Sequence, residues 1–289
     1  MPHPAFTPGA VAVITGGASG IGLAAAKEFA RRGLTVVIAD VDGVHLAGAA
    51  AAVKAETPDA SVAVRVTDVS RRDDLEALEA MVRETFGGTD VLMNNAGVQP
   101  GSHMFAPQAN WERVLGVNLW GVIHGCHVFV PQMIARGRPG LVVNTGSKQG
   151  ITTPPGDPAY NVSKAGVKTF TELLAHELRT TPNCALTAHL LIPGFVFTAL
   201  TARGRTRKPA GAWTPEQTVD AMMAHLERGD FYILCPDNEV TRTLDERRIL
   251  WAAGDLVENR PALSRWHPDY AEAFAAFVKA GDKDSGEKK

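Results

Sequence analysis

The sequence has very little cysteine. Only Cys126, Cys184 and Cys235 occur in 289 residues, and none forms the Cys-x-x-Cys spacing typical of zinc or redox sites. Three scattered thiols argue against a disulfide framework and indicate reduced, buried cysteines. His124 and His127 flank Cys126, but a metal site there has weak support, because Cys126 points away from the face that the two histidines share. We therefore expect no metal.

Long apolar runs and an excess of one charge are also missing. No apolar stretch approaches the roughly 18 residues that span a bilayer, and residues 1–6 lack a basic-then-apolar leader pattern. Lys and Arg total 29 against 31 Asp and Glu, so the net charge is −2 and gives no footprint for nucleic acid or an anionic membrane. We expect a cytoplasmic protein that binds a small molecule and neither nucleic acid nor membrane.

Short apolar strands alternate along the chain with helical segments. Strands are expected near 10–15, 34–40, 61–67, 90–95, 140–146, 184–192 and 231–235. Helices are expected near 21–32, 43–56, 71–86, 108–136, 157–181 and 215–228, the last starting with a capping box at Thr214. This alternation predicts an α/β fold, a Rossmann-type doubly wound parallel sheet of about seven strands with helices on both faces. No linker divides the chain, so we expect a single domain over 1–289 with its core at about 10–236.

A glycine-rich turn follows the first expected strand. The apolar run 11–14 passes into Thr15-Gly16-Gly17-Ala18-Ser19-Gly20-Ile21-Gly22 and then into a helix. Glycines allow a tight turn and close approach of the backbone to a ligand, and the free amides at a helix start favour a pyrophosphate. The turn therefore predicts a dinucleotide site.

Asp40 ends the second expected strand, 18 residues after Gly22 and close to the ~20 expected for an acid that binds a ribose. Its carboxylate can accept hydrogen bonds from the ribose hydroxyls and would repel a 2′-phosphate. Neither Ala18 nor Ser19 supplies a compensating cation. NAD is therefore expected in preference to NADP.

Tyr160 and Lys164 lie four residues apart in an expected helix and so share one face. A nearby ammonium favours the phenolate and is expected to lower the pKa of Tyr160 from its usual ~10. Such a pair can act as a general acid and base. The spacing alone is common in helices, so the rest of the chain has to support this interpretation.

With these motifs in order, the chain resembles the short-chain dehydrogenase/reductase family over roughly residues 10 to 236. The glycine turn and the Tyr160–Lys164 pair match its cofactor turn and its catalytic pair. Further matches are Asp68-Val69, Asn95-Ala96-Gly97, Asn118, Ser147 and the segment Pro193-Gly194-Phe195-Val196-Phe197-Thr198.

The resemblance implies a role for each matching residue. The implied catalytic group is Asn118, Ser147, Tyr160 and Lys164, with Ser147 bonded to the substrate oxygen and Asn118 holding a water near Lys164. The implied cofactor contacts are Gly16, Ser19, Gly20, Ile21, Gly22, Asp40, Asp68, Val69, Asn95, Ala96, Gly97, Tyr160, Lys164, Pro193, Gly194, Val196 and Thr198. Family members are usually dimers or tetramers through the helices near 108–136 and 157–181, so a homodimer or homotetramer is expected.

Three features depart from the family pattern. Lys148 and Gln149 follow Ser147, and they could either enter the pocket or point to solvent. A basic cluster at 203–208 could attract an acidic substrate, but it fits a solvated loop better. About 50 residues follow Leu234; their aromatic residues predict two helices near 239–254 and 268–280, joined through Trp266-His267-Pro268. This extension, about 237–281, either enlarges the core or forms a wall for a bulky apolar substrate, and 282–289 is expected to be disordered.

Together these features predict an NAD-dependent oxidoreductase that interconverts a secondary alcohol and a ketone, with Tyr160 as the acid/base. Two alternatives stay open. One is a catalytically silent sensor or scaffold that binds a dinucleotide, although such a protein would not need the four catalytic residues together. The other is a reductase of an activated C=C bond or an imine on the same fold.

Overall fold

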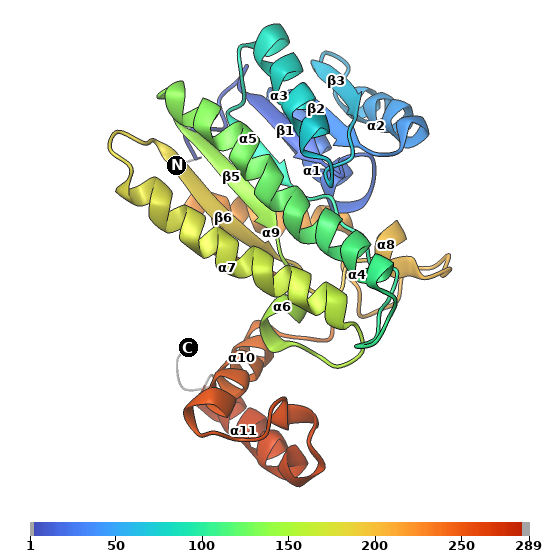
Figure 1. The fold of residues 1–289 in the computed structure, drawn as a ribbon, viewed down its shortest axis with the longest axis vertical. Helices are drawn as coiled ribbons and strands as arrows, with labels where there is room; N and C mark the ends of the chain where they lie inside the picture. Colours follow the sequence, from blue (N-terminus) through green and yellow to red (C-terminus); the bar gives the residue numbers. More distant parts are fainter. Residues whose placement is uncertain (1–2, 285–289) are drawn as a thin grey trace.

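Seven parallel strands form one sheet in the structure, a computed structural model that describes residues 3–284 (Figure 1). The strands are β1 (Val11–Thr15), β2 (Thr35–Asp40), β3 (Val62–Val66), β4 (Val91–Asn94), β5 (Gly140–Thr145), β6 (Leu186–Ile192) and β7 (Tyr232–Leu234). Their order is β3-β2-β1-β4-β5-β6-β7, so the chain runs outwards from β1 to β3 and then crosses back to β4, which places the switch point of the sheet between β1 and β4. The predicted doubly wound Rossmann-type fold is confirmed.

Helices cover both faces of this sheet (Figure 1). One face packs against α1 (Gly20–Arg31), α2 (Gly43–Glu56) and α9 (Pro215–Arg228). The other packs against α3 (Arg72–Phe86), α5 (Gly121–Ala135) and α7 (Pro158–Thr180). Strand β1 is buried throughout, and its alternate side chains serve the two cores: Ile14 joins the first and Val13 the second. The capping box at Thr214 is confirmed at the start of α9.

The expected helix over 108–136 is divided. It consists of α4 (Gln108–Leu115), a π-helical turn η1 (Gly116–Trp120) and α5, and Asn118 lies in the π turn. By length and composition alone the stretch Gln108–Ala135 could cross a membrane, a test that a helix buried in a protein core also passes. Several side chains of α5, including Phe129, lie in the core beneath it, as expected for a helix that covers a sheet.

The core begins earlier than expected. Ala5 and Phe6 are buried, and the ring of Phe6 lies 5.5 Å from that of Phe29 on α1. These residues precede the first predicted strand, and their apolar side chains were the only signal that they would pack. Short helices α6 (Gln149–Thr152) and α8 (Ala199–Ala202) also follow β5 and β6, where no helix was expected.

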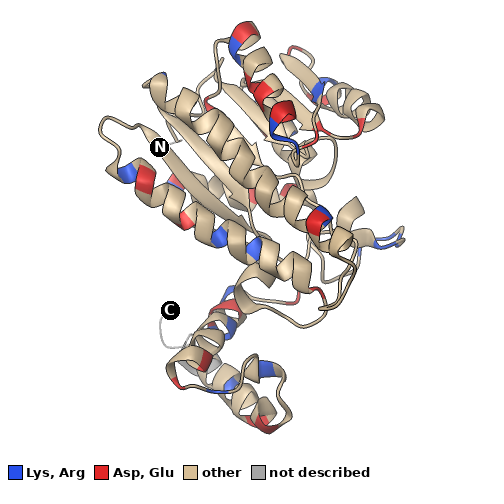
Figure 2. Ribbon diagram, viewed as in Figure 1, with Lys and Arg blue, Asp and Glu red and all other residues tan. Residues whose placement is uncertain are grey.

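The carboxyl-terminal extension forms a helical unit that projects beyond the sheet layers (Figure 1). It contains α10 (Arg242–Val257), the 3-10 turns η2 (Ser264–Trp266) and η3 (Pro268–Tyr270), and α11 (Ala271–Asp284). Both helices exist, each shifted about three residues towards the carboxyl terminus from its predicted start. Residues 282–284 belong to α11, contrary to the expected disorder, and 285–289 lie outside the described residues. Charges of both signs are spread over this unit (Figure 2).

Candidate active site

The glycine turn joins β1 to α1 at the carboxyl edge of the sheet. Gly16 has a φ of +61°, and a Cβ there would lie 2.6 Å from the Cα of Ala96, so only glycine fits. A Cβ on Gly22 would collide with the carbonyl of Gly16. Ser19 is the N-cap of α1 but makes no side-chain cap bond, which leaves the first amides of the helix free for an anion.

Two aspartates stand at the neighbouring strand ends. Asp40 closes β2, and its Oδ2 accepts a hydrogen bond from the Ala18 amide at 3.1 Å, which ties the carboxylate to the glycine turn. Asp68 follows β3, and its Oδ1 accepts bonds from the amide and the hydroxyl of Ser70 at 2.9 and 2.6 Å. Each carboxylate oxygen can accept two hydrogen bonds, and in both aspartates at least one oxygen accepts no more than one from the protein. Both side chains can therefore accept hydrogen bonds from a ligand.

Asn95 links three strand ends. Its Nδ2 donates to the carbonyl oxygens of Thr15 and Gly16 at 3.3 and 3.1 Å, and its Oδ1 accepts from the Thr145 hydroxyl at 3.3 Å. The amide of Asn95 in turn donates to the Thr15 hydroxyl at 3.0 Å. Asn95 therefore fixes the glycine turn against β4 and β5. The sequence predicted a cofactor contact for this residue, and these bonds add a structural role.

Tyr160, Ser147 and Lys164 meet at the inner end of the site. Tyr160 and Lys164 are both buried on α7, and the Lys164 Nζ lies 5.7 Å from the centre of the Tyr160 ring. Ser147, which follows β5, lines the same cavity as these two residues. Lys164 also donates to the carbonyl of Thr145 at 2.8 Å.

The protonation of this group differs from the sequence-based expectation. Burial raises the pKa of Tyr160 to about 12, the hydrogen bond from Ser147 opposes this rise, and Asp157 adds to it. Burial lowers the pKa of Lys164 to about 8. The prediction that Lys164 would lower the pKa of Tyr160 is thus wrong, because burial disfavours the charged forms of both groups.

Asn118 lies next to this group but does not line the cavity. It is fully buried in η1, its Oδ1 accepts from the Val98 amide at 2.8 Å, and its Nδ2 donates to the Val98 carbonyl at 2.9 Å. The same Nδ2 lies 3.3 Å from the Ser163 hydroxyl. The side-chain amide of Asn118 is therefore occupied by hydrogen bonds within the protein, and these bonds hold the backbone of Val98 in place. Turns of π-helix are frequent at functional sites.

One cavity of about 510 Å³ connects these parts. It runs from the strand ends of β2 and β3, past the glycine turn, to Ser147 and Tyr160. All the residues expected to bind cofactor line it except Gly22, and all the catalytic residues line it except Asn118. It is also lined by residues that the motifs did not include: Val41, Thr67, Ser70, Val98, Glu112, Arg113, Val117, Thr145, Gly146, Leu200 and Thr201. Most of these adjoin a predicted residue, which was the available signal.

The structure shows where the three features that depart from the family pattern lie. Lys148 enters neither the cavity nor the solvent: its ammonium is paired with Asp237 and Asp245 from the carboxyl-terminal part of the chain. Gln149 accepts a hydrogen bond from Gln99 at 3.3 Å. The basic loop at 203–208 is exposed after α8 (Figure 2), and neither it nor any described residue from 237 onwards lines the cavity.

A doubly wound sheet with a glycine turn and a ligand-sized cavity at its switch point defines a nucleotide-binding α/β protein. The comparison with known families is more specific. Residues 10–209 match the family model described as short chain dehydrogenase, and the chain belongs to this family of oxidoreductases.

Curated relatives agree with this assignment. The chain is similar to 1-deoxy-11-beta-hydroxypentalenate dehydrogenase of Streptomyces arenae, with 31% identity over 276 residues that cover 93% of this chain and 97% of that protein. It is also 33% identical over 217 residues to the probable oxidoreductase EphD of Mycobacterium tuberculosis. That match covers 74% of this chain but only 35% of EphD, which is a much longer protein.

Solved structures share the fold. A short chain dehydrogenase/reductase from Burkholderia phymatum in complex with NAD is 31% identical, with a TM-score of 0.79 over 88% of this chain and 96% of that one. The alcohol dehydrogenase from the archaeon Thermococcus sibiricus complexed with 5-hydroxy-NADP is 26% identical, with a TM-score of 0.68 over 75% of this chain and 90% of that one.

Proposed function

We propose that the protein interconverts a secondary alcohol and a ketone with NAD as the cofactor, and that Tyr160 exchanges a proton with the substrate oxygen. One observation carries the proposal. A buried tyrosine, a serine and a buried lysine, Tyr160, Ser147 and Lys164, all line the cavity that begins at the glycine turn. A group placed in this way can donate to or accept from an oxygen in the cavity.

The residues divide the work of proton transfer. Tyr160 gives its proton to the carbonyl oxygen in reduction and takes one from the alcohol in oxidation, while Ser147 hydrogen-bonds the same oxygen. The raised pKa of Tyr160 keeps the resting phenol neutral, ready to donate. Lys164 supplies the nearby positive charge that a phenolate needs during oxidation. Asn118 positions this group by fixing the Val98 backbone.

The cavity fits a nicotinamide dinucleotide. The glycine turn would hold the pyrophosphate at the start of α1, where Ser19 makes no side-chain cap bond and leaves the first amides of the helix free. Asp40 would bind the adenosine ribose, and Asp68-Val69 the adenine. Lys164 would bind the nicotinamide ribose, and the Pro193–Thr198 segment would hold the nicotinamide. When bound, the cofactor supplies or accepts the hydride.

NAD is proposed over NADP because of Asp40. The related structures hold NAD in one case and an NADP derivative in the other, so they support the class of cofactor rather than a choice within it. In this chain the Asp40 carboxylate lines the cavity at the end of β2, where a 2′-phosphate would meet like charge.

We also propose a homodimer or homotetramer in the cytoplasm, acting on a small-molecule substrate. Exposed apolar residues on η1 and α7, namely Trp120, Val162 and Leu173, support the assembly. Three free cysteines are consistent with a reducing compartment.

The test is to follow NADH absorbance while NAD is offered with aliphatic, alicyclic, benzylic and acidic secondary alcohols. Tyr160→Phe is expected to lower kcat on the best alcohol by about 10²- to 10⁴-fold and to retain NADH binding, since only the proton-transfer group is lost. Tyr232→Phe is the matched control, because this exposed hydroxyl bonds Glu172 far from the cavity and its loss should leave kcat unchanged.

Two outcomes would contradict the proposal. NADH binding without turnover of any alcohol or ketone would favour the sensor. Turnover restricted to activated C=C bonds or imines would favour the other reductase chemistry.

A further inference from the structure

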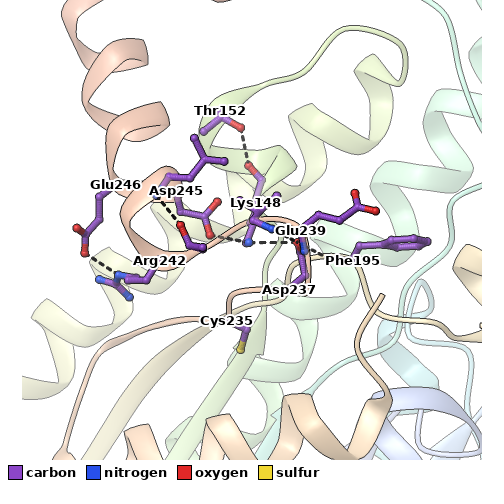
Figure 3. Close-up of polar contacts among 12 residues, drawn as sticks. Lys148, Thr152, Phe195, Cys235, Asp237, Glu239, Arg242, Asp245 and Glu246 are labelled. Atoms are coloured by element: carbon purple, nitrogen blue, oxygen red, sulfur yellow. Dashed lines mark hydrogen bonds and ion pairs between the residues drawn. The ribbon is translucent and has the colours of Figure 1, made fainter. Parts of the chain in front are cut away.

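Lys148 carries a buried positive charge directly after Ser147. Its Nζ lies 3.4 Å from Oδ2 of Asp237 and 2.5 Å from Oδ2 of Asp245 (Figure 3). The three side chains are only 16%, 7% and 5% exposed. Asp237 follows β7 and Asp245 lies on α10, so the charge links the sheet edge to the extension. We call Lys148, Asp237 and Asp245 the Lys148 cluster.

The Lys148 cluster also holds the loop after β6. Oδ2 of Asp237 accepts a hydrogen bond from the Phe195 amide at 3.2 Å. Gly194 packs directly on the cluster, since a Cβ there would lie 2.6 Å from Asp237 Oδ2 and 3.0 Å from Lys148 Nζ. The Lys148 amide donates to the Pro193 carbonyl at 3.4 Å. The cluster thus fixes two loops against each other.

Both loops line the same end of the cavity. Ser147 lies on one, and Pro193 and Gly194 lie on the other. Asp40 and Asp68, at the ends of β2 and β3, line the opposite part of the cavity and make no contact with the cluster. A change in the cluster should therefore be felt at one half of a bound dinucleotide.

We propose that Lys148, Asp237 and Asp245 are positioning residues through which the carboxyl-terminal extension holds the nicotinamide half of the cofactor site in place. The inference rests on the proposed function and deepens it. Buried charges are retained only when they are paired, and removing one partner leaves the others without compensation. Loss of Asp245 frees Lys148 from α10, and the loops that carry Ser147 and Gly194 lose a common anchor. An extension that merely added to the core would have no such selective effect on the site.

The test compares two ligands that differ only in the nicotinamide half. Dissociation constants for NADH and for ADP-ribose, which lacks the nicotinamide, are measured by calorimetry for the wild type, Lys148→Met and Asp245→Asn. We expect each variant to weaken NADH binding by about fivefold or more, as for loss of a buried charged partner, and to change ADP-ribose binding by less than about twofold. Glu246→Gln is the matched control, because this neighbour on α10 is exposed and pairs with Arg242 at 2.8 Å rather than with the cluster. It should change neither constant.

Other outcomes would overturn the inference. If the variants bound NADH and ADP-ribose more weakly by the same factor, or bound both as the wild type does, the role of the cluster would be purely structural. Asp245→Asn decides if Lys148→Met does not fold, because it keeps the Lys148–Asp237 pair. A wild-type protein that binds neither ligand would overturn the proposed function, and the inference with it. If the wild type binds NADH but the variants lose no affinity for it, the inference alone fails and the proposed function stands.

Discussion

Lys164 meets two opposing demands. It has to stay charged beside Tyr160 to support a phenolate, yet it is almost fully buried and its one hydrogen bond goes to the Thr145 carbonyl. Burial therefore lowers its pKa to about 8, within reach of ordinary assay conditions. A residue kept at such a cost to stability is typical of a functional site.

This conflict predicts a pH dependence of stability. Below pH 8 Lys164 is protonated in both states and the full burial penalty applies. Between its folded pKa of about 8 and its unfolded value of 10.5, the unfolded state binds more protons, so the free energy of unfolding rises with pH. Relative to Lys164→Met, the wild type should gain up to about 3 kcal/mol over this range. Urea unfolding at several pH values measures the difference. Lys168→Met is the control for replacing a lysine on the same helix, because the Lys168 ammonium lies nearer the surface, where it pairs with Glu172.

Asp40 is expected to decide cofactor choice. In Asp40→Asn the negative charge is lost while an amide oxygen remains in the same position to accept the hydrogen bond from the Ala18 amide, so the glycine turn keeps this bond. The ratio of kcat/KM with NADP to that with NAD should rise by about tenfold or more, which corresponds to ~1.4 kcal/mol. Steady-state kinetics with both cofactors measure it. Asp42→Asn should leave the ratio unchanged, because Asp42 caps α2 and does not line the cavity. An equal rise in both variants would contradict the prediction.

Single residues also show where sequence reasoning ends. Asp40 and Ser147 could be placed at the site because each follows a strand in a recognisable order. The partners of Lys148 could not, because Asp237 and Asp245 lie about 90 residues away and meet it only through packing. The raised pKa of Tyr160 could not be predicted from the sequence for a related reason. Spacing reveals the neighbouring lysine, but the burial that outweighs it belongs to the folded molecule.

At the scale of elements, the strands were the most predictable part. A parallel strand covered on both faces is apolar along its length, as β1 and β5 are, and parallel strands end at a common edge. Interruptions in helices were harder to predict. The turn η1 lies within a continuous apolar pattern, and the contact that its Asn118 makes with the Val98 backbone joins segments 20 residues apart.

The extension depends on one residue for its own small core. Trp251 is buried on α10, its ring lies 5.3 Å from those of Phe274 and Phe277, and its Nε1 donates to the Ser264 hydroxyl at 2.8 Å. Trp251→Ala should cost about 3 to 5 kcal/mol locally. Hydrogen exchange should then speed up over 242–284 and stay slow in the sheet, as expected of a separate cooperative unit.

The control for that experiment lies on the same helix. Leu256 is 88% exposed, so Leu256→Ala should leave exchange unchanged. Faster exchange throughout the sheet in Trp251→Ala would show instead that the extension and the body unfold together.

For the whole molecule, the exposed apolar residues are unevenly placed. Val162 and Leu173 are 50% and 64% exposed on α7, and their separation of eleven residues, three helical turns, puts them on one face. Trp120 in η1, a turn that contacts α7, is 52% exposed. A second copy of the chain presenting the same face would bury all three.

The assembly prediction follows from this face. Light scattering should give a dimer or a tetramer of 30.7-kDa subunits. Leu173→Glu should raise the dissociation constant by at least about tenfold, because a carboxylate in an apolar interface has to be desolvated without a partner. Val44→Glu is the control: Val44 is 85% exposed on α2, on the opposite side of the sheet, and its change should leave the mass as it was. A monomeric wild type, or an equal effect of the two substitutions, would show that α7 is not the interface. The apolar face of α7 would then need another partner.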